Sequence, residues 1–140
     1  MAFNILIVDD SEVMRSVIRR VIKLSGFDLG SVFEADHGES ALKVLDENWI
    51  DVVLTDINMP VMDGVELLRR MKANEILAAI PVIMVSTEGR SKRIEEILEI
   101  GAAGYITKPF KPEDIRNLIS EALGVDIDGT FADGPEESDF

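Results

Sequence analysis

Cysteine is absent from this chain, which excludes a disulfide framework and any thiolate nucleophile or metal ligand. A run of apolar residues long enough to span a membrane is also absent. The first apolar run, residues 3–8, ends directly in Asp9 and Asp10 and shows neither a basic start nor a cleavage pattern. We therefore expect a cytoplasmic protein.

The only histidine, His37, lies near the start of an expected helix, which favours a surface or capping role over phosphotransfer.

Positive charge is scarce, with 14 Lys and Arg against 27 Asp and Glu and a net charge of -13. Because binding to nucleic acid or to anionic membrane needs Lys and Arg gathered on one surface, this balance argues against both partners. The segment after Leu123 contains acidic residues but no Lys or Arg. We expect a folded domain at residues 1–124 and an acidic, flexible tail at 125–140. Binding of Ca²⁺ by Asp126 and Asp128 is disfavoured, since Phe131 stands where the calcium loop needs glycine.

The pattern of hydrophobic residues predicts one α/β domain, and 46% hydrophobic residues in 140 suffice for its core. Short β-branched runs predict strands at residues 3–8, 29–34, 51–55, 82–85 and 104–107. Apolar residues at three-to-four spacing predict a helix after each strand, the fourth ending at Ile100 and the fifth spanning 112–123. Five strands alternating with five helices indicate a doubly wound parallel sheet.

Five polar residues follow the expected strands: Asp9, Asp10, Asp56, Ser86 and Lys108. Right-handed crossovers bring the carboxyl ends of parallel strands to one edge, so these side chains should converge there. Three carboxylates within a few ångströms of one another repel by about 4 kcal/mol per close pair at an effective dielectric near 20. A hard cation such as Mg²⁺ fits this oxygen-rich set and shares oxygens with phosphoryl groups.

Each of these polar residues has a chemical role in that setting and a plainer structural one. Lys108 supplies a point charge for a phosphoryl oxygen, the Ser86 hydroxyl a hydrogen bond, and Asp56 is the natural nucleophile for an acyl phosphate. Taken singly, Asp9 and Asp10 could cap a helix and Lys108 could belong to a turn. Their joint placement at four strand ends favours metal-assisted phosphoryl chemistry over these separate structural roles.

At these residues the sequence resembles the receiver domains of two-component response regulators, particularly stand-alone chemotaxis receivers of the CheY type. The resemblance covers nearly everything from Phe3 to Leu123. It is carried by the segments Ile7-Val8-Asp9-Asp10-Ser11, Thr55-Asp56-Ile57-Asn58-Met59-Pro60, Met62-Asp63-Gly64, Met84-Val85-Ser86-Thr87-Glu88 and Gly104-Tyr105-Ile106-Thr107-Lys108-Pro109-Phe110. It implies a flavodoxin-like sheet with strand order 2-1-3-4-5.

The resemblance also implies a role for each site residue. Asp56 would take a phosphoryl group from a phosphohistidine on a sensor histidine kinase. Asp10, Asp56 and the main-chain carbonyl of Asn58 would ligate Mg²⁺, with Asp9 acting at least partly through water. Lys108 would contact the phosphoryl group and precede a cis proline bond. Such a protein is a signalling switch that catalyses its own phosphorylation and autodephosphorylation, and not an enzyme acting on other substrates.

In the family, the switch is read by partner proteins. Ser86 would move toward the phosphoryl group, and Tyr105 would turn inward into the space it leaves. The readout surface would comprise the fourth helix, fifth strand and fifth helix, with Ile94, Tyr105, Thr107 and Leu118 as contacts. Expected partners are a downstream protein target, such as the flagellar motor or another effector, and a phosphatase. Both a monomer and a phosphorylation-dependent dimer fit the pattern.

Three other functions compete with this interpretation. A phosphatase of the haloacid dehalogenase type shares Mg²⁺ and a related fold, but carries Asp-x-Asp after its first strand, whereas Asp9 and Asp10 are adjacent. An adaptor that binds regardless of phosphorylation would have no need of the intact set of Asp56, Ser86 and Lys108. A P-loop nucleotide enzyme is disfavoured because the sequence lacks G-x-x-x-x-G-K-[ST].

Overall fold

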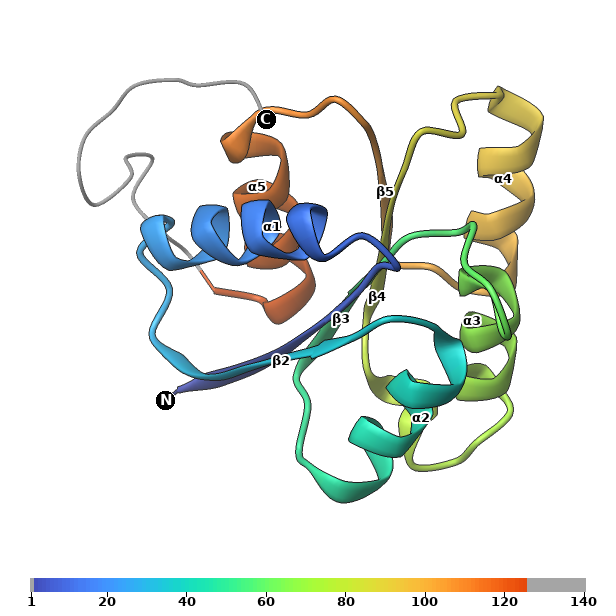
Figure 1. Cartoon of the computed structure of the whole chain (residues 1–140), viewed down its shortest axis with the longest axis horizontal. Helices are drawn as coiled ribbons and strands as arrows, with labels where there is room; N and C mark the ends of the chain where they lie inside the picture. Colours follow the sequence, from blue (N-terminus) through green and yellow to red (C-terminus); the bar gives the residue numbers. More distant parts are fainter. Residues whose placement is uncertain (1, 126–140) are drawn as a thin grey trace.

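The computed structural model describes residues 2–125, and it forms a five-stranded parallel sheet in the order β2-β1-β3-β4-β5 (Figure 1). The strands are β1 (Phe3–Val8), β2 (Leu29–Ala35), β3 (Val52–Thr55), β4 (Val82–Ser86) and β5 (Gly104–Thr107). The helices are α1 (Glu12–Leu24), α2 (Gly38–Glu47), α3 (Gly64–Lys72), α4 (Ser91–Ile100) and α5 (Pro112–Leu123). The predicted fold class and strand order are confirmed, while the acidic residues 126–140 lie outside the described part of the chain.

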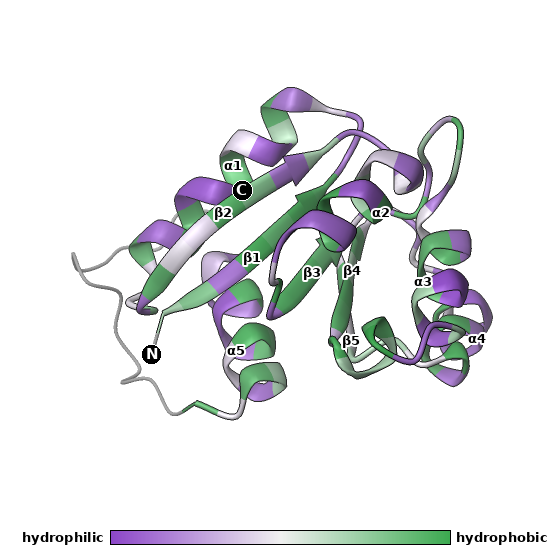
Figure 2. Cartoon of the chain, turned by 90° about the horizontal axis from the view of Figure 1, so that it is seen from below, coloured by the Kyte–Doolittle hydropathy of each residue, from purple (hydrophilic) through white to green (hydrophobic). Residues whose placement is uncertain are grey.

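The sheet is a middle layer, with α1 and α5 on one face and α2, α3 and α4 on the other (Figures 1 and 2). Side chains of β1 alternate between the two cores: Ile5 and Ile7 pack on the side of α1 and α5, whereas Leu6 and Val8 pack on the opposite side. All four are at most 1% exposed. Burial on both faces explains why the central strands β1, β3 and β4 are largely apolar, and Figure 2 draws them mostly in green.

Side chains cap the N-termini of α1, α2 and α3. Ser11 accepts a hydrogen bond from the Met14 amide at the start of α1, and Asp63 accepts one from the Glu66 amide at the start of α3. His37 caps α2 by accepting from the Ser40 amide through Nδ1 at 3.2 Å. The predicted capping role of the single histidine is therefore confirmed.

Two details go beyond or refine the sequence pattern. A short 3-10 helix, η1 (Leu77–Ala79), precedes β4 and was not predicted, because it buries no residue and so leaves no apolar periodicity. In α4, Ile97 is fully buried but Leu98 is 42% exposed, so the packing face of this helix centres on Ile97. The helix ends at Ile100, as predicted, where Gly101 adopts a φ of 129°. No helix within residues 2–125 is both long and apolar enough to cross a membrane.

The loop between β3 and α3 contains a strained residue, Val61, whose φ is 68°. The Met62 amide donates to the Pro60 carbonyl at 2.7 Å, which closes a tight turn around Val61. A positive φ is costly for a β-branched side chain, by about 1 to 3 kcal/mol. Glycine removes that strain but loses about 0.5 to 1 kcal/mol through the freedom of the unfolded chain. We expect Val61→Gly to raise the free energy of unfolding by about 1 kcal/mol in urea denaturation.

Val61→Ala is the matched control for this prediction, since it removes the branched side chain but keeps Cβ. We expect it to gain less stability than the glycine variant. Equal stability of the two variants would show that the turn conformation of Val61 is not a source of strain.

Candidate acidic site at the carboxyl edge of the sheet

Three carboxylates converge at the carboxyl edge of the sheet, as the strand ends predicted. One carboxylate oxygen from each of Asp9, Asp10 and Asp56 lies within 4.8 Å of the others. Main-chain pairing fixes this arrangement, because the Asp56 amide donates to the Val8 carbonyl at 2.9 Å, continuing the pairing of β3 with β1. The position of the site is therefore set by the register of the central strands.

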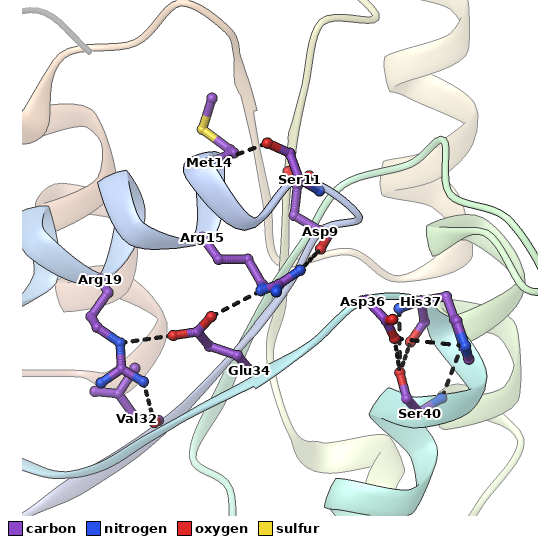
Figure 3. A network of polar contacts seen from close by, with 10 residues as sticks. All are labelled: Asp9, Ser11, Met14, Arg15, Arg19, Val32, Glu34, Asp36, His37 and Ser40. Atoms are coloured by element: carbon purple, nitrogen blue, oxygen red, sulfur yellow. Dashed lines mark hydrogen bonds and ion pairs between the residues drawn. The ribbon is translucent and has the colours of Figure 1, made fainter.

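Asp9 is only 2% exposed, and each of its polar groups has a partner. Its amide donates to the Ala35 carbonyl at 3.1 Å, and its own carbonyl accepts from Nη1 of Arg15 at 2.6 Å (Figure 3). Its Oδ1 accepts from the Ser11 amide at 2.8 Å, and its Oδ2 accepts from Nζ of Lys108 at 3.0 Å. Two contacts hold the side chain of Asp9 and two hold its main chain, so this residue suits a supporting role in a metal site more than direct coordination.

Asp10 and Asp56 have more freedom than Asp9. Asp10 is exposed. The side chain of Asp56 is 13% exposed, with Oδ1 accepting from the Ile57 amide at 2.7 Å and Oδ2 lying 3.4 Å from Nζ of Lys108. An ionised carboxylate that is partly open to solvent and oriented by a main-chain amide is a competent nucleophile.

Lys108 directly follows β5 and places its ammonium between Asp9 and Asp56. Its amide donates to the Ser86 carbonyl at 2.8 Å, which fixes the start of its side chain beside β4. The peptide bond from Lys108 to Pro109 is cis, as predicted.

The charges at this site do not balance. Three carboxylates and one ammonium leave two net negative charges in a largely buried place. A divalent cation with a preference for oxygen ligands offsets that excess, so the donor set of Asp9, Asp10 and Asp56 fits Mg²⁺. The predicted Asn58 lies in the loop after Asp56 and is exposed, and its part in metal binding stays a prediction.

Ser86 and Tyr105 do not join the carboxylates directly but meet at Glu88. Ser86 is fully buried, and its hydroxyl accepts from the Glu88 amide at 3.3 Å. The Tyr105 hydroxyl donates to the Glu88 carbonyl at 2.6 Å, and burial raises the pKa of this phenol. The loop at Glu88 thus connects the Ser86 hydroxyl at the end of β4 with an aromatic side chain on β5.

Sequence reasoning missed two residues that support the site. Gly64 entered the sequence analysis only as part of the segment Met62-Asp63-Gly64, yet a Cβ at this position would lie 2.0 Å from the carbonyl oxygen of Asp56. Arg15 was not singled out, because its contact with Asp9 depends on the fold bringing α1 against the end of β1. The dipeptide Asp63-Gly64 at a helix start was the available signal for Gly64, whereas no pattern pointed to Arg15.

Gly64→Ala is expected to disturb Asp56, since the added methyl group meets backbone that cannot rotate away. Overpacking of this kind costs about 1 to 3 kcal/mol, and the displaced Asp56 should also bind Mg²⁺ more weakly. Urea denaturation and Mg²⁺ titration calorimetry measure the two effects. Gly89→Ala is the control, because its Cβ would meet only Thr107 at an ordinary 3.7 Å. If both variants behaved alike, the close approach at Asp56 would not matter.

Comparison with known proteins agrees with this geometry. Residues 5–120 match the response regulator receiver domain. A CheY homologue of Campylobacter jejuni is 38% identical over 122 residues, which cover 86% of this chain and 92% of that protein. The structure of CheY4 of Vibrio cholerae has a TM-score of 0.78 at 29% identity, covering 88% of this chain and 100% of that one. CheY in the CheX-CheY-BeF3-Mg²⁺ complex of Borrelia burgdorferi has a TM-score of 0.77 at 29% identity, covering 86% and 89%.

The family match spans most of the chain and includes every strand end that supplies the acidic site. It favours the receiver interpretation over the haloacid dehalogenase phosphatases that share Mg²⁺ chemistry. The chain belongs to the response regulator receiver domain family, as a CheY-like signalling switch of two-component systems.

Proposed function

We propose that Asp56 is the phosphoryl acceptor of this receiver and that a sensor histidine kinase is the donor. The observation that carries the proposal is the position of the Asp56 carboxylate, partly exposed and 3.4 Å from the Lys108 ammonium. A carboxylate oxygen of Asp56 attacks phosphorus and forms a P–O bond. The P–N bond to the donor imidazole breaks, and the imidazole keeps the electron pair and takes up a proton.

Mg²⁺ would be held by Asp10, Asp56 and the Asn58 carbonyl, with Asp9 acting at least partly through water. When bound, the cation neutralises negative charge on the phosphoryl oxygens. The four contacts that immobilise Asp9 support its indirect role, and the exposure of Asp10 supports direct coordination. The Borrelia complex, which includes Mg²⁺ and BeF3, supports the choice of metal.

Lys108 would exchange its carboxylate partners for a phosphoryl oxygen once Asp56 is modified. The ammonium already lies within reach of the acceptor, so a small movement suffices. Autodephosphorylation would reverse the modification: water attacks phosphorus, the P–O bond to Asp56 breaks, and the carboxylate and inorganic phosphate are released. The protein's own residues would orient both steps, and the aspartate returns to its starting form.

The chain of contacts through Glu88 would convert phosphorylation into a change of surface. Ser86 would leave its bond with the Glu88 amide to donate to a phosphoryl oxygen, and the Glu88 carbonyl would carry that shift to Tyr105. The affected surface consists of α4, β5 and α5. A pocket of about 440 Å³ lies there, lined by Tyr105, Ile106, Thr107, Asp114, Asn117 and Leu118.

This surface would bind the downstream partner, with Ile94 of α4 at its other side. The partner would be a protein such as the flagellar motor or another effector, and a phosphatase would end the signal. The pairing of CheY with CheX in the Borrelia complex supports protein partners of this kind. The same face would serve a phosphorylation-dependent dimer if the protein does not stay monomeric.

Intact mass spectrometry tests the proposal. The full chain is incubated with Mg²⁺ and acetyl phosphate, and we expect one phosphoryl group per chain, located at Asp56 by peptide fragmentation. With EDTA in place of Mg²⁺ the modification should be lost. A chain that stays unmodified with both reagents, or that instead hydrolyses unrelated phosphate esters with many turnovers, would contradict the receiver chemistry.

A further inference from the structure

A network of ion pairs connects α1 with the edge strand β2 beside the acidic site (Figure 3). Arg15 and Arg19 lie on the same face of α1, and both bind Glu34. Nε of Arg15 lies 2.8 Å from Oε1 of Glu34, and Nε of Arg19 lies 2.9 Å from Oε2. Nη2 of Arg19 also donates to the Val32 carbonyl at 2.9 Å. Both carboxylate oxygens of Glu34 are thereby occupied, which fixes the two guanidinium groups against the strand.

The carboxylate of Glu34 is ionised at neutral pH. Although burial acts in the opposite direction, the hydrogen bonds from Arg15 and Arg19 hold its pKa below the ordinary value. The side chain of Arg15 is only 16% exposed, so its pairing is partly shielded from water. Such a pair holds its geometry better than an exposed ion pair on the surface does.

Arg15 also contacts the main chain of Asp9, and it does so through a different nitrogen from the one that binds Glu34. Its Nη1 donates to the main-chain carbonyl of Asp9 at 2.6 Å, while its Nε remains on Glu34. That carbonyl belongs to the peptide bond between Asp9 and Asp10. Its orientation therefore determines the direction in which the exposed Asp10 side chain leaves the backbone.

We propose that Arg15, oriented by Glu34, is a positioning residue that presets the Asp9–Asp10 peptide for binding of Mg²⁺ and so determines the metal affinity. The inference rests on the Mg²⁺ site of the proposed function. Repulsion from Asp9 and Asp56 tends to push the Asp10 carboxylate away when no cation is bound. With Arg15 in place, the peptide keeps its orientation, and Mg²⁺ does not have to order it.

Charge and positioning make opposite predictions for the removal of Arg15. If Arg15 acted only as a nearby positive charge, its loss would reduce repulsion of Mg²⁺ and tighten binding. If it positions the peptide, its loss weakens binding, about 10-fold to 100-fold for a residue that supports a metal ligand. The sign of the change therefore separates the two roles.

Titration calorimetry with MgCl₂ on the full chain measures this sign. We expect Arg15→Ala to raise the Kd for Mg²⁺ by about 10-fold to 100-fold. Arg15→Lys should also bind weakly although it keeps the charge, because one ammonium cannot span Glu34 and the Asp9 carbonyl together. Arg20→Ala is the matched control: it removes the same charge from an exposed position of α1 and should leave the Kd unchanged.

Several results would overturn the proposal. One is a Kd for Mg²⁺ in Arg15→Ala that is equal to or below the Kd in Arg20→Ala. Another is a Kd in Arg15→Lys that equals the wild-type value. Urea denaturation in EDTA shows whether the variants fold. Should Arg15→Ala fail to fold, Glu34→Gln replaces it, with a several-fold weaker affinity expected and an unchanged affinity counting against the proposal.

The proposed site itself is tested separately in the same titration. Wild type should bind Mg²⁺, and Asp10→Asn should not. Absence of binding in wild type would contradict the proposed function, whereas normal binding by wild type and by Arg15→Ala together would contradict only the role of Arg15.

Discussion

Replacing Asp56 by asparagine is expected to abolish covalent phosphorylation, with no mass increase after incubation with Mg²⁺ and acetyl phosphate. The amide is neither charged nor nucleophilic, so it cannot form the acyl phosphate. The other groups around it remain: Asp9 keeps its bonds to Ser11 and Lys108.

The same substitution should stabilise the protein when Mg²⁺ is absent. It removes two carboxylate repulsions and only one attraction, that between Asp56 and Lys108 at 3.4 Å. The free energy of unfolding in EDTA should rise by about 1 kcal/mol, as measured in urea. Mg²⁺ should stabilise the variant less than wild type, because one ligand is lost.

Asp46→Asn is the control for these measurements, since Asp46 is an exposed aspartate on α2 far from the strand ends. It should be phosphorylated like wild type. Modification of Asp56→Asn at the wild-type level would mean that another residue accepts the phosphoryl group.

Loss of the Lys108 ammonium is expected to separate metal binding from phosphoryl transfer. Lys108→Ala removes the cation that lies 3.0 Å from Asp9 and 3.4 Å from Asp56, so these carboxylates lose the ammonium that offsets their charge. Mg²⁺ should therefore bind more tightly, because it no longer competes with the ammonium. Phosphorylation at saturating Mg²⁺ should nevertheless slow by about 100-fold, since an electrostatic contact to the transferring group is lost.

Calorimetry and the initial rate of mass increase measure these two opposite changes. Lys43→Ala, which removes an equivalent charge from an exposed site on α2, is the matched control and should change neither quantity. A Lys108→Ala protein that was phosphorylated at the wild-type rate would show that the ammonium only balances charge in the resting state.

The sequence predicted those parts of the molecule whose residues carry a local pattern. The central strands are buried on both faces, so Ile5 to Val8 and Val52 to Thr55 appear as continuous apolar runs. The convergence of Asp9, Asp10, Asp56 and Lys108 followed from these runs, because parallel strands share one carboxyl edge. The resemblance then supplied the cis bond before Pro109, which no periodicity could have predicted.

Contacts that depend on register could not be predicted in this way. Arg15 and Glu34 are far apart in the sequence. They meet only because β2 pairs with β1 in the register that places Glu34 opposite Ile7. Gly64 reaches the Asp56 carbonyl through the path of the loop, which passes the strained Val61. The exposure of Leu98 likewise reflects how α4 is turned against α3 and β5, and not its apolar spacing.

The carboxylates lie at a different position along the sheet from the surface formed by α4, β5 and α5. Asp9, Asp10 and Asp56 extend from β1 and β3 near its centre, whereas Leu118 of α5 lies beside β5 at its edge. Evolution can therefore exchange exposed side chains on α4 and α5 without touching the carboxylates of the acidic site. A duplicated copy of such a chain can therefore acquire a new binding partner while it keeps the same acidic site.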